Sequence, residues 1–408
     1  MNFSILFVDD EQMVLKGLKR SLHTMRAEWE MHFALSGEEG LRILEQEEVD
    51  LVISDMYMPG MDGAQFLSRV QAEHPHAVRM ILSGHSDQQL LLKIITPAHK
   101  FLSKPCSKDS LVQSVQRVQL CRRFVSDPGL RSKLNEIGTL PVHPLFYPLI
   151  LEAVGQDCPQ QVAEVLPYDV GMVANILKVV MNSFFGEVKS LPSLEILSRM
   201  LGVETLKEMV CSQNEFAHYQ DILLPEFSVL NLWRHCLRTA KHAAAIARAE
   251  SKDPQLINSC YLGGLLHDTG KLALLLTLGR SYAQALAHTE EKGLLLKDVE
   301  MQELGISHEA VGAYLLGLWG LPLNIVEVLA FHLQPEYSRK SGFKPLAAVH
   351  VANVFDHFLV SFSDKSQKRP LHKEYLEKSG LLERLPAWKK ACEEVYRQEI
   401  RDKKLLLL

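Results

Sequence analysis

The sequence predicts two domains, a doubly wound α/β domain with a five-stranded parallel sheet and an all-α domain behind it. Up to about residue 120, short apolar runs alternate with amphipathic helical patterns, as expected for a parallel sheet covered by helices on both faces. From about residue 130, the runs give way to patterns of about 12 to 20 residues at helical spacing. Because 408 residues exceed one ordinary core, a division into two domains is expected.

Five short runs are the candidate strands of the sheet. They are rich in Ile, Val, Leu, Phe or Met, and they are Ser4–Val8, Glu30–Ala34, Leu51–Ser54, Arg79–Ser83 and Lys100–Ser103. We expect the order 2-1-3-4-5, in which the second strand is outermost and strands one and three are neighbours. Functional groups then collect beyond the carboxyl ends of the strands.

The change in pattern also sets the predicted domain boundaries. These are 1–122 for the α/β domain, 123–133 for a linker, 134–360 for the helical domain and 361–408 for a charged helical appendage. Val125–Gly129 carries the turn residues of a linker. The last segment holds 12 Lys or Arg and 8 Asp or Glu, a mixed-charge pattern suited to an exposed helix.

Composition excludes several classes of protein. The net charge of −5 and the pI near 6.4 do not indicate a nucleic-acid or acidic-membrane binder. The N-terminus lacks the basic and apolar regions of a signal peptide, and no apolar stretch is long enough to span a bilayer. Seven cysteines form no CxxC pair, which favours reduced thiols. We therefore expect a cytoplasmic protein with no membrane or direct nucleic-acid partner.

Three carboxylates are predicted to converge at one edge of the sheet. Asp9 and Asp10 close the first strand, and Asp55 closes the third, its neighbour. Such carboxylates repel one another unless a hard cation lies among them. Mg²⁺ suits this site because it takes a few carboxylate oxygens, a carbonyl and waters, and the carbonyl of Tyr57 is placed to contribute.

Two further residues complete this predicted pocket. Ser83 ends the fourth strand and Lys104 follows the fifth. A hydroxyl and an ammonium group there can bind the oxygens of a phosphoryl group arriving on Asp55. A single Asp or Lys at a strand end is usually a cap or a solvated residue. The ordered set, one member at the end of each successive strand, indicates chemistry.

Residues 3–120 resemble the receiver domain of two-component signalling. The resemblance rests on FVDDE (7–11), DLVISDMYMPGMDG (50–63), ILSGH (81–85) and FLSKP (101–105). It implies that Asp55 is the phospho-acceptor, that Asp9 and Asp10 are Mg²⁺ ligands, and that Ser83 and Lys104 contact the phosphoryl group. Phe101 falls at the position of the family's switch aromatic, although a strand residue packed in the core is the alternative.

The helical half contains one sharp motif, His267-Asp268 within GGLLHDTGKL (263–272). Adjacent His and Asp side chains can bind metal if further ligands approach from elsewhere, and His235, His308 and His332 are candidates. A lone His on a helix is more often structural, and 17 histidines make chance pairs common.

From about Leu134 to His357 the chain resembles the HDOD domain, a member of the HD superfamily. The matching segments are 176–186, 193–202, 232–235, 263–274, 307–322 and 330–335. Active HD phosphohydrolases hold metal with a His, the His-Asp pair and a later Asp. By this resemblance His235, His267 and Asp268 match the first three positions, but Asn353 stands at the fourth.

The neutral Asn353 removes one negative charge from this set and should weaken divalent binding. Asp356 lies one turn further on, out of register by about 60°. The segment after His332 also lacks the GYP motif of related cyclic-di-GMP phosphodiesterases. Three readings remain open: a vestigial pair in a regulatory bundle, a metal site without hydrolysis, and a working phosphohydrolase. We expect the first, with no metal assigned to this domain.

Together these features predict a response regulator of a phosphorelay. A sensor histidine kinase or a phosphotransfer protein would supply the phosphoryl group to Asp55. The helical HDOD module would then act through contacts with a downstream signalling protein. The alternative is a metal-dependent HD phosphohydrolase gated by the receiver.

Overall fold

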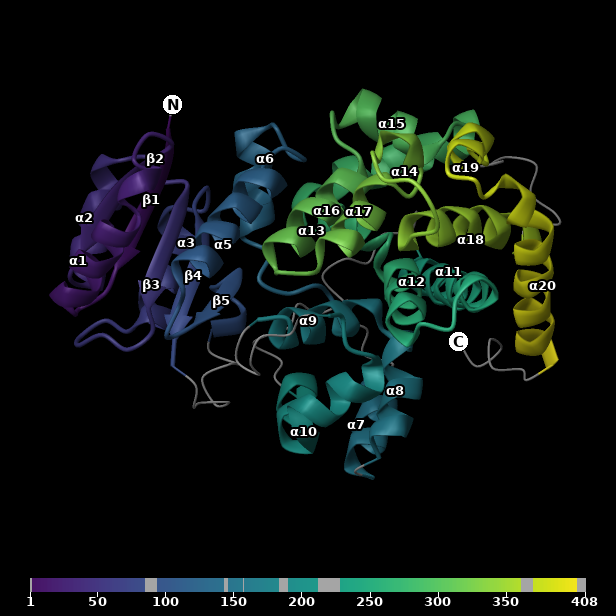
Figure 1. Ribbon diagram of the computed structural model, residues 1–408, viewed down its shortest axis with the longest axis horizontal. Helices are drawn as coiled ribbons and strands as arrows, with labels where there is room; N and C mark the ends of the chain where they lie inside the picture. Colours follow the sequence, from purple (N-terminus) through teal and green to yellow (C-terminus); the bar gives the residue numbers. More distant parts are fainter. Residues whose placement is uncertain are drawn as a thin grey trace.

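Five parallel strands form one sheet at the N-terminal end of the molecule, drawn in purple and blue in Figure 1. The computed structural model describes residues 2–84, 94–142, 146–156, 158–182, 190–211, 228–360 and 370–401. The strands are β1 (Phe3–Val8), β2 (Trp29–Ala34), β3 (Leu51–Asp55), β4 (Val78–Ser83) and β5 (Lys100–Ser103), in the order β2-β1-β3-β4-β5. The predicted strands, their parallel arrangement and their order are confirmed.

Alternation along β1 divides the apolar side chains between the two faces of the sheet. Ile5 and Phe7 pack with residues of α1 and α5, whereas Leu6 and Val8 pack with residues of α2 and α3. The helices are α1 (Gln12–Ser21), α2 (Gly37–Gln46), α3 (Gly63–Glu73) and α5 (Lys108–Cys121), and His23–Met25 forms the short 3₁₀ helix η1. Both faces of the sheet are therefore covered, as the nearly continuous apolar strands require.

The regular elements longer than one residue that the structure describes in the second half are all helices, as predicted. Its helices are α6 (Pro128–Asn135), α7 (Tyr147–Gly155), α8 (Pro159–Val165), α9 (Val170–Val180), α10 (Leu194–Cys211), α11 (Val229–Glu250), α12 (Pro254–Leu266), α13 (Thr269–Leu278), α14 (Arg280–Lys292), α15 (Leu296–Glu303), α16 (His308–Leu318), α17 (Leu323–Phe331) and α18 (Pro345–Val360), with 3₁₀ turns η3 (Leu166–Tyr168) and η6 (Pro335–Tyr337). Helix α11 packs against α12 and α18. A Cβ on Gly264 of α12 would lie 2.8 Å from the Cα of Ala240, so glycine permits this close helix packing.

The predicted linker contains the start of a packed helix. Asp127 caps α6, its side chain accepting a hydrogen bond from the backbone N–H of Leu130, and Pro128 is the first residue of the helix. Leu130 and Leu134, four residues apart, are buried in the same apolar core as residues of both domains. Residues 123–133 therefore join the two domains through a shared core and not through a free tether.

The described residues of the C-terminal charged segment, 370–401, are mainly helical, but α20 is not simply exposed. This segment contains α19 (Lys373–Lys378), the 3₁₀ turn η7 (Leu382–Arg384) and α20 (Leu385–Arg401). Helix α20 packs against α11 (Figure 1). Trp388 and Cys392 are fully buried, and the Trp388 indole N–H donates to Glu250 at 2.7 Å. The spacing of four residues places both side chains on one face, which the high charge content of the segment conceals.

No helix within the described ranges is long and apolar enough to cross a membrane. The cysteines that the structure describes in full are unpaired, and they are Cys106, Cys121, Cys158, Cys236, Cys260 and Cys392.

Trp388→Ala should lower the free energy of unfolding by about 3–5 kcal/mol, because it leaves a large cavity between α20 and α11. The measurement is a urea titration followed by circular dichroism. Gln398→Ala, an exposed position of the same helix, is the control and should change stability little. Equal effects of the two substitutions would show that α20 does not depend on this packing.

Candidate functional site

The carboxyl ends of β1 and β3 bring three carboxylates together. Val8 of β1 pairs with Ser54 of β3, so Asp9 and Asp55 follow adjacent positions of neighbouring strands. One oxygen from each of Asp9, Asp10 and Asp55 lies within 4.8 Å of the others. Asp9 and Asp55 are buried, whereas Asp10 is exposed. The convergence expected from the strand order is thus present.

Lys104 spans two of these carboxylates. Its Nζ lies 2.7 Å from Oδ1 of Asp55 and 3.0 Å from Oδ2 of Asp9. Burial raises the pKa of Asp55, and the charge of Asp9 adds to this effect, while Lys104 opposes it. Burial alone would lower the pKa of Lys104, but its bonds to Asp55 and Asp9 outweigh burial and raise it. The pocket therefore holds an ammonium group beside the predicted phospho-acceptor.

The same carboxylates fit the Mg²⁺ that a receiver domain generally requires. Three oxygens from Asp9, Asp10 and Asp55 are near enough to share one ion, and the exposed side of Asp10 leaves room for water ligands. Such an ion would neutralise negative charge around the acceptor. The side chain of Tyr57 is exposed, and the role of its carbonyl group as a ligand stays a prediction.

Ser83 and Phe101 lie where the strand pattern placed them. Ser83 ends β4, is buried, and donates its hydroxyl hydrogen bond to the carbonyl of Gly84 at 3.1 Å. Phe101 lies in β5 with its side chain buried in the apolar layer that also contains Ile81 and Ile94. The final residue of the ILSGH motif, His85, lies outside the described residues.

In the helical domain, four imidazoles surround one buried carboxylate, that of Asp268. His235 lies on α11, His267 and Asp268 lie between α12 and α13, His308 begins α16, and His332 follows α17. The Nε2 atoms approach Asp268 in two pairs: His308 at 3.2 Å and His332 at 3.5 Å from Oδ1, His267 at 3.4 Å and His235 at 3.6 Å from Oδ2. The four helical segments thus converge on a single side chain.

Each of these imidazoles is oriented through its other nitrogen. The Nδ1 atoms lie 2.7 Å from Oδ2 of Asp356 for His235, 2.7 Å from the Gly264 carbonyl for His267, 2.7 Å from Oε2 of Glu300 for His308, and 3.2 Å from the Leu329 carbonyl for His332. Acceptors at Nδ1 place the donor proton there and turn Nε2 inward, as is usual for metal-binding histidines.

Charge differs between the two sides of Asp268. Lys271 donates to Oδ2 at 2.6 Å, so an ammonium group occupies the side of His235 and His267. Burial alone would raise the pKa of Asp268, but His267 and Lys271 hold it well below its usual value. Burial likewise would lower the pKa of His308, but Glu300 and Asp268 raise it to about 9. The carboxylate is therefore ionised, and its surroundings favour positive charge.

Asn353 and Asp356, the two residues considered for the fourth position of the HD pattern, have different surroundings. Asn353 is buried and lines a pocket, whereas Asp356 accepts hydrogen bonds from His235 and from Arg238 at 2.6 Å. Burial alone would raise the pKa of Asp356, but His235 and Arg238 hold it well below its usual value. Asp356 thus orients His235 and does not join the group around Asp268.

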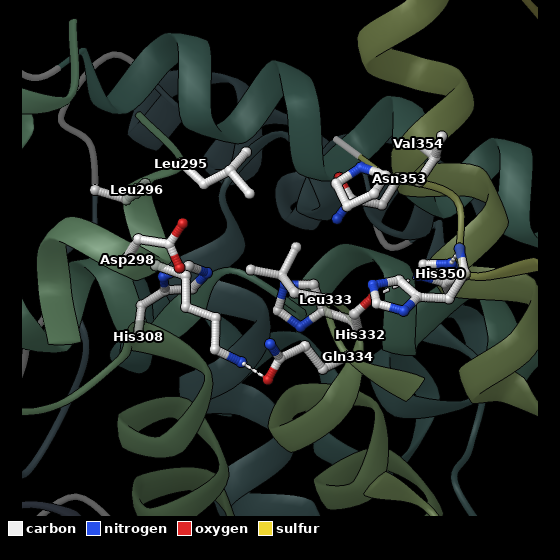
Figure 2. A pocket seen from close by; sticks show the side chains of 13 residues that line it. Leu295, Leu296, Asp298, His308, His332, Leu333, Gln334, His350, Asn353 and Val354 are labelled. Carbon is white, nitrogen blue, oxygen red and sulfur yellow. Dashed lines mark hydrogen bonds between the residues drawn. The ribbon is translucent and has the colours of Figure 1, made fainter. Parts of the chain in front are cut away.

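A pocket with a cavity volume of about 140 Å³ opens beside this cluster, and Figure 2 shows its lining. His308, His332 and Asn353 face it together with Leu295 and His350. Two of the four imidazoles therefore border this pocket, although their side chains have no exposed surface. His235 and His267 are absent from its lining.

Sequence reasoning did not single out Glu300 and Lys271. Glu300 is fully buried. Its carboxylate accepts one hydrogen bond from the hydroxyl of Tyr282 at 2.9 Å and another from the backbone N–H of His308 at 3.0 Å. The ion pair between Lys271 and Asp268 could have been predicted, because residues three positions apart on a helix lie on the same face. No local pattern marks Glu300, because its contact with His308 depends on how α15 meets α16.

Comparison with known proteins identifies both halves of the chain. Residues 5–116 match the response regulator receiver domain, and residues 141–335 match the HDOD domain. The transcriptional regulatory protein GlrR of Escherichia coli (strain K12) is 38% identical over 112 residues, which are 27% of this chain and 25% of GlrR. The sensor kinase CckA of Brucella abortus (strain 2308) is 34% identical over 118 residues, 28% of this chain and 12% of CckA.

Among solved structures, the signal receiver domain of an HD domain-containing protein from Pseudomonas fluorescens Pf-5 is 30% identical with a TM-score of 0.29, over 30% of this chain and 98% of that chain. The chain spans about a quarter or less of the length of the curated relatives named above. The protein therefore carries a receiver domain followed by an HDOD domain, which confirms both resemblances seen in the sequence.

Gly63→Ala should destabilise the receiver domain by about 1–3 kcal/mol through overpacking. A Cβ there would lie 2.2 Å from the carbonyl oxygen of Asp55 and 2.9 Å from the Cα of Met56, and both are backbone atoms. Urea denaturation measures the effect. Gly17→Ala on α1, where a Cβ meets nothing within 4 Å, is the matched control. A Gly63→Ala protein as stable as the control would contradict this close approach.

Proposed function

We propose that the protein is a response regulator that accepts a phosphoryl group on Asp55 and passes that signal to its HDOD domain. The observation that carries the proposal is the contact of Lys104 with both Asp55 and Asp9 at the edge of a receiver sheet. The donor is a sensor histidine kinase or a phosphotransfer protein, as the receiver family implies.

The transfer requires little covalent chemistry from the protein. An oxygen of Asp55 attacks phosphorus, the P–N bond of the donor phosphohistidine breaks, and the imidazole leaves with the electron pair. A Mg²⁺ ion held by Asp9, Asp10 and Asp55 would supply charge neutralisation. Lys104 then binds a phosphoryl oxygen in place of its contact with Asp55, and Ser83 can donate its hydroxyl to another.

The HDOD domain touches the receiver along the strand that precedes Lys104. The backbone N–H of Phe101 in β5 donates to Oδ1 of Asn182 at 3.1 Å, directly after α9. Lys178 of α9 is fully buried, donates to the carbonyls of Ile95 and Gly138, and lies 4.8 Å from the centre of the Trp319 ring. A residue that follows an output helix thus satisfies one backbone group on the edge of β5.

A second contact between the receiver and the helical domain lies near the start of β4. Arg79 is buried and donates to the carbonyls of Pro97 and Asn135, and His99 also contacts the Asn135 carbonyl. The side chain of Asn135 accepts from the hydroxyl of Tyr314 on α16 at 2.7 Å. Buried polar groups so connected are costly to separate one at a time, which favours a change between two discrete arrangements.

Phosphorylation would bias that change. The phosphoryl group adds nearly two negative charges and three acceptor oxygens beside Lys104, only three residues after Phe101. A displacement of β5 alters the hydrogen bond to Asn182 and, through α9, the packing of Lys178 on Trp319. The effect is a population shift between docked arrangements, read out by a downstream signalling protein.

The second candidate function is a metal-dependent phosphohydrolase gated by the receiver. The pocket that reaches His308 and His332 favours it, because a hydrolase needs substrate access to its metal. The neutral side chain of Asn353, where active HD phosphohydrolases have a carboxylate, favours the regulatory function.

Asp55→Asn should abolish labelling by acetyl phosphate in the presence of Mg²⁺, and removal of one carboxylate from a repulsive cluster should preserve the fold. Mass spectrometry of the intact protein measures the phosphoryl group. Asp109→Asn, an exposed position at the start of α5, should label like the wild type. Undiminished labelling of Asp55→Asn would refute the assignment of the acceptor.

Asn182→Ala should uncouple the domains while leaving phosphorylation intact, because it removes the acceptor of the Phe101 N–H without touching the acidic pocket. Hydrogen exchange of α9 and α16 is compared with and without acetyl phosphate. We expect the phosphorylation-dependent difference to disappear in Asn182→Ala. It should persist in Gln71→Ala, which loses a more exposed interdomain hydrogen bond to Glu136. A response retained in Asn182→Ala would place the coupling elsewhere.

A further inference from the structure

His99 lies at the junction between the receiver and the helical domain, directly before β5. Its side chain is buried, and its two ring nitrogens have different partners. Nδ1 lies 3.0 Å from the backbone nitrogen of Arg79, which can only donate, so Nδ1 accepts and carries no proton. Nε2 lies 3.1 Å from the backbone carbonyl of Asn135, which can only accept, so Nε2 carries the proton. The contacts therefore select one neutral tautomer of the imidazole.

A protonated His99 would break this arrangement. Because an imidazolium carries a proton on both nitrogens, the proton on Nδ1 would face the backbone N–H of Arg79. That N–H would lose its acceptor, and a positive charge would be buried beside it. An unsatisfied buried donor and a buried charge are both costly. The junction as it stands therefore excludes the charged form of this histidine.

The charges that act on His99 are positive. The guanidinium group of Arg79 is buried and donates to the carbonyls of Pro97 and Asn135, and the amino group of Lys178 on α9 is buried in the same junction. Burial lowers the pKa of His99 well below its usual value, and the charges of Arg79 and Lys178 add to this effect. Burial and the charge of Arg79 also lower the pKa of Lys178.

Other ionisable groups at the junction do not offset these cations. Lys100 is a further cation, and burial lowers its pKa to about 8. Burial lowers the pKa of His76 and raises that of Tyr314, so both side chains are neutral near neutral pH. Glu136, whose charge reaches Arg79, is exposed, so water screens it. A proton on the imidazole would therefore add to an uncompensated positive charge.

The acceptor on the helical side has little freedom to adapt. The side chain of Asn135 donates to the carbonyl of His76 at 3.1 Å and accepts from the hydroxyl of Tyr314 at 2.7 Å. Its backbone carbonyl also accepts from Arg79. Because these bonds hold Asn135 in both domains, a small local shift cannot accommodate a charged His99, and separation of the domains is the alternative.

We propose that His99 makes the docking of the receiver on the helical domain sensitive to acid. In an open arrangement the Asn135 carbonyl leaves the imidazole, and water can solvate the charged form. The docked state therefore binds fewer protons than the open state, and docking weakens as the pH falls below about 6.5, the usual pKa of histidine. The loss levels off below the lowered pKa of docked His99. This input goes beyond the proposed function and does not depend on phosphorylation of Asp55.

The test is hydrogen exchange of the Phe101 amide in the full-length protein, followed by NMR between about pH 7 and pH 5. This N–H donates to Asn182 across the interface, so its protection factor, corrected for the intrinsic exchange rate, reports opening of the interface. Below about pH 6, protection in the wild type should fall about tenfold more per pH unit than in His99→Gln, which cannot be protonated. His23→Gln, at an exposed position of η1, should behave like the wild type. The amide of Ile53 in the central strand β3 controls for global unfolding and should show no such difference.

The other titratable groups are present in both proteins, so the difference between the two pH dependences isolates His99. Equal pH dependence in the wild type and His99→Gln would overturn the proposal. If the variant fails to fold, long-range ¹H–¹⁵N NMR of the wild type with labelled histidine decides the matter. His99, recognised by its contact with the Arg79 amide, should stay neutral with its proton on Nε2 at about pH 5.5. Protonation of His99 with a midpoint near 6.5, while the Phe101 amide stays protected, would also overturn the proposal.

Discussion

The edge strand β5 is shared by the two working parts of this molecule. At its carboxyl end the chain continues to Lys104, which contacts Asp55 and Asp9, and within the strand the backbone N–H of Phe101 is bonded to Asn182 of the helical domain. An edge strand offers unpaired backbone groups, and here a side chain from another domain satisfies one of them. The acidic pocket and the domain interface therefore meet on one short strand and the residue that follows it.

Two buried carboxylates, Asp55 and Asp268, meet the cost of burial in different ways. Asp55 lies at the carboxyl end of the central strand β3, where the half-buried ammonium group of Lys104 offsets its charge. Asp268 lies at the meeting point of several helices, with Lys271 on one oxygen and oriented imidazoles on both sides. The first carboxylate therefore relies on one neighbouring ammonium group, whereas the second is enclosed by several side chains whose orientations are fixed by further hydrogen bonds.

The helical domain shows how a superfamily motif can persist with an altered ligand set. Asn353 lacks the charge of the expected carboxylate, and Asp356, one turn away, is engaged by Arg238 and His235. The environment of Asp268 is asymmetric, because the ammonium group of Lys271 contacts Oδ2 and the Nε2 atoms of His308 and His332 lie near Oδ1. His308 and His332, which lie on one side of Asp268, also line the pocket.

The sequence by itself determined the strands, their order and the acidic set, because alternating patterns and strand-end residues are local signals whose convergence follows from parallel topology. The resemblance to the HD pattern also marked His235, His267 and Asp268 as one set. Only the tertiary structure decided the remaining contacts. Glu300 orients His308, Lys271 contacts the oxygen of Asp268 opposite the one near His308, and Asn182 meets β5. These contacts join residues on different helices or domains, whose approach depends on packing angles that no local pattern encodes.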